Sequence, residues 1–536
     1  MVVQVRIGLL FLALFTFLPT AYLHGQWTWI GGSSGPGGAA VYGPSGLFDP
    51  SFTPGALYAP GQCVDSLGRL WVFSGKLAQG SNDLWCFDPA VAEWAWISGG
   101  QGTNNAGSYG IKGLPAPTNL PKSRGYAPAM WCDAQGDIWI FGGGGASSEL
   151  NDLWRFRPGD GLWTWMHGDS IAGAVGVYGT MGIADPANTP GRRYENTATW
   201  RANDGTLWLF GGETMPFFQA YNDVWRFDPA TGMWTWMHGT AGTGGSTDYG
   251  ILNVSAPTNS PGRRGVWTRW TDDDGRFWLF GGMVHGANLP RNDLWMFDPV
   301  SAQWTWKGGT MLDADLGQYG TPCVPSSGNI PAALFEAAGV WRDDQGRFYF
   351  QGGGYRNGLN GQFLREDIWR YDPLLAEWTW LWGSGLVNPV AVHGTLGVTS
   401  ALNTPGGRMG ALAVPSGDSL VYLYGGYDIA GQARSDLWVL RTDQLCIHTG
   451  STAEERPIMN AWYDAVLGVL YCSGAEGVEH IAVHDALGRI LLSRSVPSGR
   501  GTTHTIPLSQ LPSGFWLITA SGPHGTFSTR IAPVIR

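Results

Sequence analysis

A pair of tryptophans separated by one residue returns six times along this chain. In an extended strand, residues i and i+2 point to the same side, so both indoles of a pair project together. Such a repeat predicts units that cannot bury their apolar faces alone and must stack on one another. The first tryptophans of the pairs, 67 to 74 residues apart, are Trp27, Trp94, Trp163, Trp234, Trp304 and Trp378.

The segments between the pairs repeat one order of short apolar runs and turns. In one unit, "LWLFGG" at 207–212 follows an Asp-Gly turn, "NDVW" at 222–225 comes next, and "DPATG" leads to the tryptophan pair. Short runs of aromatic and β-branched residues bounded by Gly, Asp and Pro are typical of strands, and Asp-Gly favours hairpins. With 82 Gly and 30 Trp among 536 residues, the sequence predicts an all-β chain with four antiparallel strands in each unit.

These units resemble kelch repeats, the blades of the β-propeller found in the central domain of galactose oxidase. The resemblance rests on the Gly-Gly after the second strand, the Trp of the fourth strand and the fixed distance between them, and it covers residues 26–445. The first unit departs from it with Ser74-Gly75 in place of Gly-Gly. The resemblance implies a six-bladed kelch-type propeller. The tryptophan pairs would then pack neighbouring blades, with sugar stacking as the alternative.

The first and last units are incomplete and complement each other. Residues 26–31 carry the text of a fourth strand without the three strands before it, and the last unit ends without a tryptophan pair. We therefore expect residues 26–31 to close the sixth blade from the outside. The alternative is that "LCIH" at 445–448 fills this place.

The first 25 residues have the order of a secretory signal, with Arg6, an apolar run to about Leu18 and then Pro19. We predict cleavage after Gly25, or after Ala21, and a mature chain that is secreted or attached to the cell surface. No later stretch reaches the roughly 18 apolar residues of a transmembrane span. The net charge of -10 argues against a nucleic-acid partner.

Six cysteines could form disulfides outside the cytoplasm, in any of 15 connectivities. Their spacing has no zinc pattern, no motif for a catalytic metal occurs, and we predict neither a metal nor a cofactor. The copper radical site of galactose oxidase needs clustered Tyr, His and Cys residues that the sequence does not bring together. The cysteines are Cys63, Cys86, Cys132, Cys323, Cys446 and Cys472.

A polar linker at 446–460 leads to a different C-terminal segment. Alternating apolar residues and two turns predict a small antiparallel β-sandwich over 461–536. This segment resembles the C-terminal sorting domain of the type IX secretion system, although the usual "PNP" opening is missing. The resemblance implies export across the outer membrane by that machinery. The matching positions are Val483, Asp485, Gly488, Leu508, Leu511, Gly514, Trp516 and Ile518.

Two features of the long connections between units are candidates for ligand binding. Tyr109, Tyr178 and Tyr249 each precede a Gly in these loops, where they could stack on a ligand or cover the loop itself. An Arg opens the inner strand of four units, while Leu57 and Leu334 take its place in the others. These arginines could hold an acidic ligand or make structural hydrogen bonds. They are Arg124, Arg193, Arg264 and Arg408.

These observations predict a non-catalytic binding or adhesion module for an extracellular glycan or protein. No nucleophile or metal motif supports chemistry. The alternative is an extracellular carbohydrate-active enzyme with its site at the channel mouth, which a cluster of non-repeating acids and histidines at that mouth would favour. A structural role in a surface layer is also open.

Overall fold

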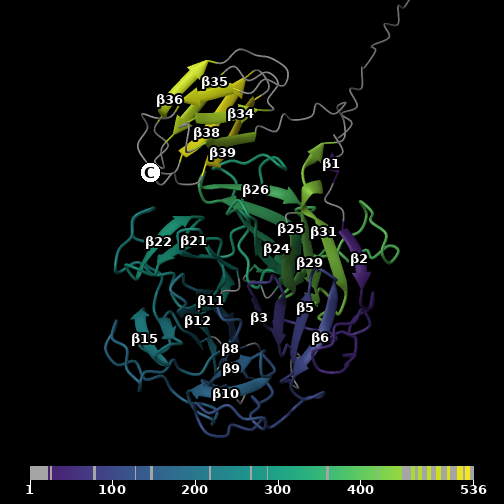
Figure 1. Ribbon diagram of the computed structural model, residues 1–536, viewed down its shortest axis with the longest axis vertical. Coiled ribbons are helices and arrows are strands. Elements are labelled where there is room, and N and C mark those ends of the chain that lie inside the picture. The colour runs from purple at the N-terminus through teal and green to yellow at the C-terminus, as the bar shows by residue number, and fades with distance from the viewer. Residues whose placement is uncertain are drawn as a thin grey trace, which may run out of the picture. The chain divides into compact units, whose positions relative to one another are not determined.

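The computed structural model describes most of the first 448 residues and seven strands after them (Figure 1). The chain divides into two units, Met1–Thr449 and Gly450–Arg536. The predicted signal peptide and linker lie almost entirely outside the described residues. The described ranges are 22–23, 27–75, 80–126, 128–144, 149–215, 219–265, 268–285, 288–357, 361–417, 419–448, 460–464, 469–473, 480–484, 490–495, 504–507, 516–522 and 525–531.

Six sheets of the first unit each follow a path of four antiparallel strands. Sheet 1 contains β3 (Gly61–Val64), β4 (Leu70–Phe73), β5 (Leu84–Asp88) and β6 (Glu93–Ser98). Sheet 2 contains β7 (Ala129–Cys132), β8 (Ile138–Phe141), β9 (Leu153–Arg157) and β10 (Leu162–His167). Sheet 3 contains β11 (Tyr194–Arg201), β12 (Leu207–Thr214), β14 (Val224–Asp228) and β15 (Met233–His238), with β13 (Gln219–Ala220) paired to β12.

The other three sheets continue the pattern. Sheet 4 contains β17 (Arg269–Thr271), β18 (Phe277–Phe280), β21 (Leu294–Asp298) and β22 (Gln303–Gly308). Sheet 5 contains β23 (Gly339–Arg342), β24 (Phe348–Arg356), β25 (Gln362–Asp372) and β26 (Glu377–Trp382). Sheet 6 contains β28 (Leu412–Ser416), β29 (Leu420–Tyr424), β31 (Leu437–Arg441) and β2 (Trp27–Gly31). Short pairings add β16 (Arg264–Gly265), β19 (Met283–Val284), β20 (Leu289–Pro290), β27 (Arg408–Met409) and β30 (Tyr427–Asp428).

Six clusters of buried apolar side chains join these sheets into a closed ring. Each cluster joins two consecutive sheets, as Phe210 of sheet 3 does with Leu279 of sheet 4, and the cluster of sheets 4 and 5 also includes Tyr58 and Met409 from sheets 1 and 6. The cluster that contains Leu70 and Leu412 joins sheet 6 back to sheet 1. The expected all-β propeller class is therefore confirmed, and the first strand of each sheet lies innermost, around the axis.

The N-terminal strand β2 occupies the outer position of sheet 6. Trp27 lies opposite Leu440 and Trp29 opposite Trp438, both in β31. The segment "LCIH" takes a different place, because β32 (Ile447–His448) pairs with β1 (Tyr22–Leu23). The chain thus closes the ring with a strand from its own beginning, and β2 shares a sheet with strands that come almost 400 residues later.

The two tryptophans of each pair have different surroundings. The first is 0 to 5% exposed and packs against the preceding sheet, as Trp234 does on Phe141 at 5.3 Å between ring centroids. The second is half-buried, and in every pair except that of Trp96 its indole donates to the carbonyl two residues later, as Trp236 does to His238 at 2.8 Å. The first indole of each pair therefore contributes more to the packing between sheets than the second.

Much of the extra length of the repeat lies along the outer strand of each sheet. The Gly182 amide donates to the carbonyl of Trp236, and Asp185 forms a bridge with Trp234. Equivalent contacts occur in the other sheets, such as Gly46 to Trp96 and Gly397 to Trp29. The loops thus occupy hydrogen-bonding groups that an exposed outer strand would offer to other chains.

Two disulfides join distant parts of the first unit. Cys63 of β3 pairs with Cys132 of β7, and Cys323 pairs with Cys446 just after the last strand of the ring. Cys86 is a buried free thiol, and burial raises its pKa. The sequence had left all these pairings open.

The second unit contains two antiparallel sheets. One has β33 (Asn460–Asp464), β34 (Val469–Ser473) and β37 (His504–Pro507), and the other β35 (His480–His484), β36 (Ile490–Ser495), β38 (Trp516–Gly522) and β39 (Gly525–Ile531). Of the sorting-domain positions, Val483 is buried in β35, and Trp516 and Ile518 belong to β38. Asp485, Gly488, Leu508, Leu511 and Gly514 lie outside the described residues.

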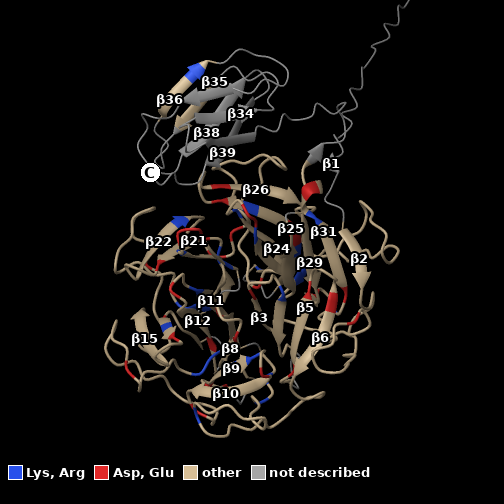
Figure 2. Cartoon of the chain, viewed as in Figure 1, with Lys and Arg blue, Asp and Glu red and all other residues tan. Residues whose placement is uncertain are grey.

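Charged residues are sparse along the ribbon, and both signs are interspersed (Figure 2). Among the described residues, no helix is long and apolar enough to cross a membrane.

Candidate functional site

The four arginines predicted from the repeat are fully buried in ion pairs. Each guanidinium lies against the Asp that opens the third strand of its own sheet, and the shortest distances are 2.7 to 2.9 Å. At Asp436, burial alone would raise the carboxyl pKa, but the charge of Arg408 lowers it well below its usual range. The pairs are Arg124 with Asp152, Arg193 with Asp223, Arg264 with Asp293, and Arg408 with Asp436.

The three predicted tyrosines contact the same aspartates. The hydroxyl of Tyr109 donates to Asp152, that of Tyr178 to Asp223 and that of Tyr249 to Asp293, at 2.6 to 2.9 Å. Each ring packs between two tryptophans of its own sheet, as Tyr178 does with Trp225 and Trp236. Burial, and then the neighbouring carboxylate, raises the pKa of all three phenols.

In the sixth unit, His393 takes the place of the loop tyrosine. It keeps the contact with the Asp that opens the third strand, so this contact belongs to the repeated fold. Its Nε2 lies 3.1 Å from Asp436, and its ring packs on Trp438. The buried Arg–Asp–Tyr groups anchor each long loop to its sheet, which accounts for these residues without a ligand. Their role in ligand binding stays a prediction, and nothing in their geometry supports it.

A different group of residues, which does not repeat, meets on the axis of the ring. Tyr58 precedes β3 of sheet 1, Glu195 belongs to β11 of sheet 3, and Glu336 precedes β23 of sheet 5. The hydroxyl of Tyr58 donates to Glu336 and is also hydrogen-bonded to Glu195. Residues of sheets 1, 3 and 5 can contact one another only across the centre of a ring of six sheets. We call these three residues the axial cluster.

The two carboxylates occupy places that hold other residues in the remaining units. They stand two residues after the repeat Arg or Leu, where the other units have Ala59, Tyr126, Val266 and Gly410. Packing of the repeat therefore does not require an acid there. Both glutamates have a positive φ, 45° at Glu195 and 49° at Glu336. The equivalent Ala59 and Gly410 also have a positive φ, 41° and 60°, so this conformation belongs to the repeat and only the acidic side chains are particular to the two glutamates.

The two glutamates share a buried environment that favours one proton. Both are less than a tenth exposed. Burial, followed by the charges of Glu336 and Glu213, raises the pKa of Glu195 well above its usual value. Tyr58 donates its one proton to Glu336, and its contact with Glu195 lowers the pKa of that carboxyl against the larger effect of burial. Oε1 of Glu195 is buried and has no hydrogen-bond partner among the described residues.

Further polar and aromatic side chains surround the axial cluster. The Nε2 atom of buried His285, from sheet 4, lies 3.1 Å from Oε1 of Glu213. The ring of Tyr126 packs on Tyr194 at 5.3 Å, and that of Tyr427 on Tyr58 at 5.0 Å. Glu195 also raises the pKa of Tyr126, which places the two within electrostatic reach. All six sheets thus contribute a residue to this end of the channel.

This arrangement brings together an acid of raised pKa, a phenol and a second carboxyl. A carboxyl whose pKa is raised by burial, beside a second carboxyl, is an arrangement that acid–base catalysis uses. Hydroxyl and carboxyl groups beside aromatic rings also suit a ligand rich in hydroxyl groups. Among the described residues, no group of three or more His, Cys, Asp and Glu side chains could hold a metal ion.

Motif searching missed the axial cluster because its members lie in three different units. The available signal was the exception to the repeat: an acid at a position that is Ala, Gly, Tyr or Val elsewhere.

Comparisons with known proteins add little to this description. No family model and no curated protein matches the chain. A solved structure described as "Structure of YjhT" is similar over 72% of this chain and 95% of its own, with 13% sequence identity and a TM-score of 0.43.

Proposed function

We propose that this protein is an exported six-bladed propeller of the kelch type that acts on carbohydrate at the axial cluster. The observation that carries the proposal is the hydrogen-bonded chain from Glu195 through Tyr58 to Glu336, made by residues that the repeat does not require. Six four-stranded sheets in a closed ring support the blade count. The signal-like residues 1–25 and the sorting-like residues 461–536 support export to the cell surface or the medium, with type IX secretion machinery as the partner.

In this proposal, Glu195 is the general acid. Burial raises its pKa and so favours the protonated form, and Glu336, which accepts the Tyr58 hydrogen bond, is the partner carboxyl. Tyr58 holds both carboxyls and can carry a proton between them. His285 and Glu213 lie beside this chain and would contact the ligand from sheets 4 and 3.

Binding without chemistry is the second candidate, and one observation favours it. Each long loop carries an aliphatic side chain that is 49 to 58% exposed at the same place, five residues after the loop Tyr or His. A repeated apolar position on the surface suits contact with a protein or another surface. These residues are Leu47, Leu114, Ile183, Val254, Val324 and Val398.

The two candidates are separated by assaying the full-length secreted protein against a panel of neutral and acidic oligosaccharides. Binding is read on a glycan array, and chemistry by the release of reducing ends and by the NMR signals of the anomeric protons. The variants are Glu195→Gln, Glu336→Gln and Tyr58→Phe, with Glu377→Gln at the start of β26 as the control. If the axial cluster is catalytic, Glu195→Gln should lower the reaction rate roughly 10²–10⁴-fold and leave glycan binding unchanged. A glycan that binds unchanged, with no reaction in any variant, would leave the binding module as the function.

A further inference from the structure

A pocket of about 560 Å³ lies at the other end of the channel, where the inner strands finish. Its walls come from the last residues of β3, β7, β11, β17 and β23 and the turns that follow them. The axial cluster stands near the beginnings of these strands, so the pocket is a separate site. Its volume is within the range of pockets that hold small ligands.

Three arginines from consecutive inner strands line this pocket. They are Arg201 of β11, Arg269 of β17 and Arg342 of β23. Strand register aligns Arg201 with Val64 and Cys132 in sheets 1 and 2, which are uncharged. Packing of the repeat therefore does not explain the arginines.

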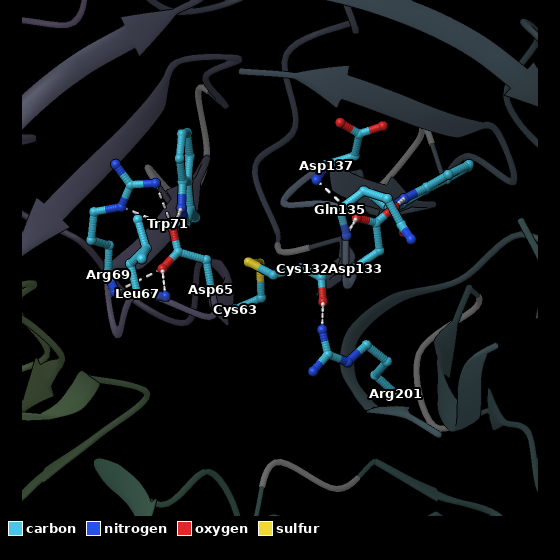
Figure 3. The surroundings of a disulfide bond; sticks show 11 residues. Cys63, Asp65, Leu67, Arg69, Trp71, Cys132, Asp133, Gln135, Asp137 and Arg201 are labelled. Atoms are coloured by element: carbon cyan, nitrogen blue, oxygen red, sulfur yellow. Dashed lines mark hydrogen bonds and ion pairs between the residues drawn. A yellow bond between two sulfur atoms is a disulfide. The ribbon is translucent and has the colours of Figure 1, made fainter. Parts of the chain in front are cut away.

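Two of these arginines donate hydrogen bonds to backbone carbonyls. Arg201 donates to the carbonyl of Cys132 at 3.4 Å (Figure 3), and Arg269 donates to the carbonyl of Thr199 at 2.9 Å. Burial lowers the pKa of Arg269 to about 10, so it remains charged at neutral pH. A guanidinium bonded to a carbonyl keeps its full charge, because the carbonyl is neutral.

The two acids of the pocket wall are already engaged. Asp273 forms an ion pair with Arg342. Asp272 accepts from Arg276 and from the indole of Trp278, each at 2.8 Å, and holds the hairpin turn. Three arginines and two aspartates leave one excess positive charge on the lining, in a chain whose net charge is -10.

The wall formed by sheets 1 and 2 is cross-linked. The disulfide between Cys63 and Cys132 lies in the lining and connects the inner strands of sheets 1 and 2, with the two Cα atoms 5.6 Å apart (Figure 3). A pocket that is already formed loses little conformational entropy when a ligand binds.

We propose that this pocket binds a small anionic molecule whose oxyanion is held by Arg201 and Arg269, with Arg342 completing the cationic side. Guanidinium groups match the planar, two-oxygen geometry of a carboxylate and the oxygens of sulfate or phosphate esters. Arg276, which lies outside the lining, already pairs with Asp272, so the lining stays positive and suits an anion. A sugar acid or sugar ester of one ring fits both the charge and the volume.

The test is isothermal titration of the full-length protein with glucuronate, glucose 6-sulfate, glucose 6-phosphate and neutral glucose. The variants are Arg201→Gln and the double variant R201Q/R342Q. Arg157→Gln, whose side chain is 44% exposed at the end of β9, is the matched control. Circular dichroism establishes that each variant is folded.

We expect at least one anion to bind more tightly than glucose, with the preferred oxyanion identifying the natural ligand class. Arg201→Gln should weaken this binding roughly ten- to hundredfold, and the double variant should abolish it, while Arg157→Gln binds as the parent protein does. Anion binding that Glu195→Gln abolishes and the double variant leaves intact would place the anion at the axial cluster and overturn the proposal. The proposal is wrong if none of the three anions binds at millimolar concentration, if glucose binds equally well, or if the double variant binds normally.

Discussion

Tyr58 donates a hydrogen bond to Glu336 across 278 positions of sequence. Their sheets, 1 and 5, are separated in the ring by sheet 6 in one direction and by sheets 2, 3 and 4 in the other, so the contact exists only because the ring closes. The same phenol bonds Glu195 from a third sheet, which makes it the centre of the axial cluster.

The axial cluster predicts a loss of stability as pH rises. The pKa of Glu195 is raised in the folded protein, so the folded state holds more protons than the unfolded state above the ordinary glutamate pKa. The free energy of unfolding should therefore fall as pH rises from about 4.5 through the folded-state pKa. Glu195→Gln, which mimics the protonated acid, should flatten this slope in urea titrations between pH 4.5 and 8. An identical slope in Glu195→Gln and the control Glu377→Gln would show that Glu195 is ionised.

The raised pKa of Asp367 predicts a second change of stability with pH, confined to a defined pH range. Leu334 replaces the repeat Arg in sheet 5, and burial raises the pKa of Asp367 to about 6 from its ordinary 3.8. The folded state loses roughly 3 kcal/mol relative to the unfolded state as pH rises from about 4 through about 6. Asp367→Asn should remove this loss. In contrast, Asp436→Asn should destabilise at neutral pH, because Arg408 would lose its charged partner.

The buried ion pairs predict a structural role for the repeat arginines. Arg193→Met should lower the free energy of unfolding by roughly 3–5 kcal/mol, because Asp223 remains buried without its partner. Arg226→Met, whose side chain is 35% exposed and 3.8 Å from Asp204, should cost less than about 1 kcal/mol. Urea denaturation measures both. A stable Arg193→Met protein that no longer binds an acidic glycan would instead support the ligand role.

The tryptophan pair offers an internal comparison. Trp234→Ala removes a fully buried indole from the contact between sheets 2 and 3 and should cost roughly 3–5 kcal/mol. Trp236→Ala removes a half-buried indole and should cost clearly less. Thermal unfolding of both variants shows which substitution lowers the stability more. If sugar stacking were the role of the pairs, Trp236→Ala would chiefly reduce glycan binding.

The place of β2 in sheet 6 predicts that the stability of the protein depends strongly on its N-terminal residues. Deleting residues 1–31 removes the outer strand of sheet 6 and exposes the edge of β31, so we expect a lower melting temperature and a tendency to aggregate. A protein beginning at Gln26 is the control and should be fully stable. Equal melting temperatures of the two proteins would show that another segment can close the ring.

The repeat itself could be predicted because each unit carries its own local signals. Gly-Gly, Asp-Gly turns and alternating apolar residues set strand order within a unit, and the incomplete first and last units indicated how the ring closes. The position of the extra loop residues was harder to predict. Bonds such as Gly182 to Trp236 run to the outer strand, and loop length alone does not reveal that direction.

What the sequence alone determined is therefore the periodic part of this protein: the all-β units, the packing role of the tryptophan pairs and the long connections, whereas the difference in burial between the two tryptophans of a pair came from the structure. The tertiary structure decided which exceptions to the repeat meet. No sequence motif connects the members of the axial cluster or of the pocket, because each member lies in a different unit and has different neighbours along the chain. The members are Tyr58, Glu195 and Glu336 in the axial cluster, and Arg201, Arg269 and Arg342 in the pocket. Ring closure brings residues of different units to one axis, and burial there, away from water, changes their charge and their chemistry.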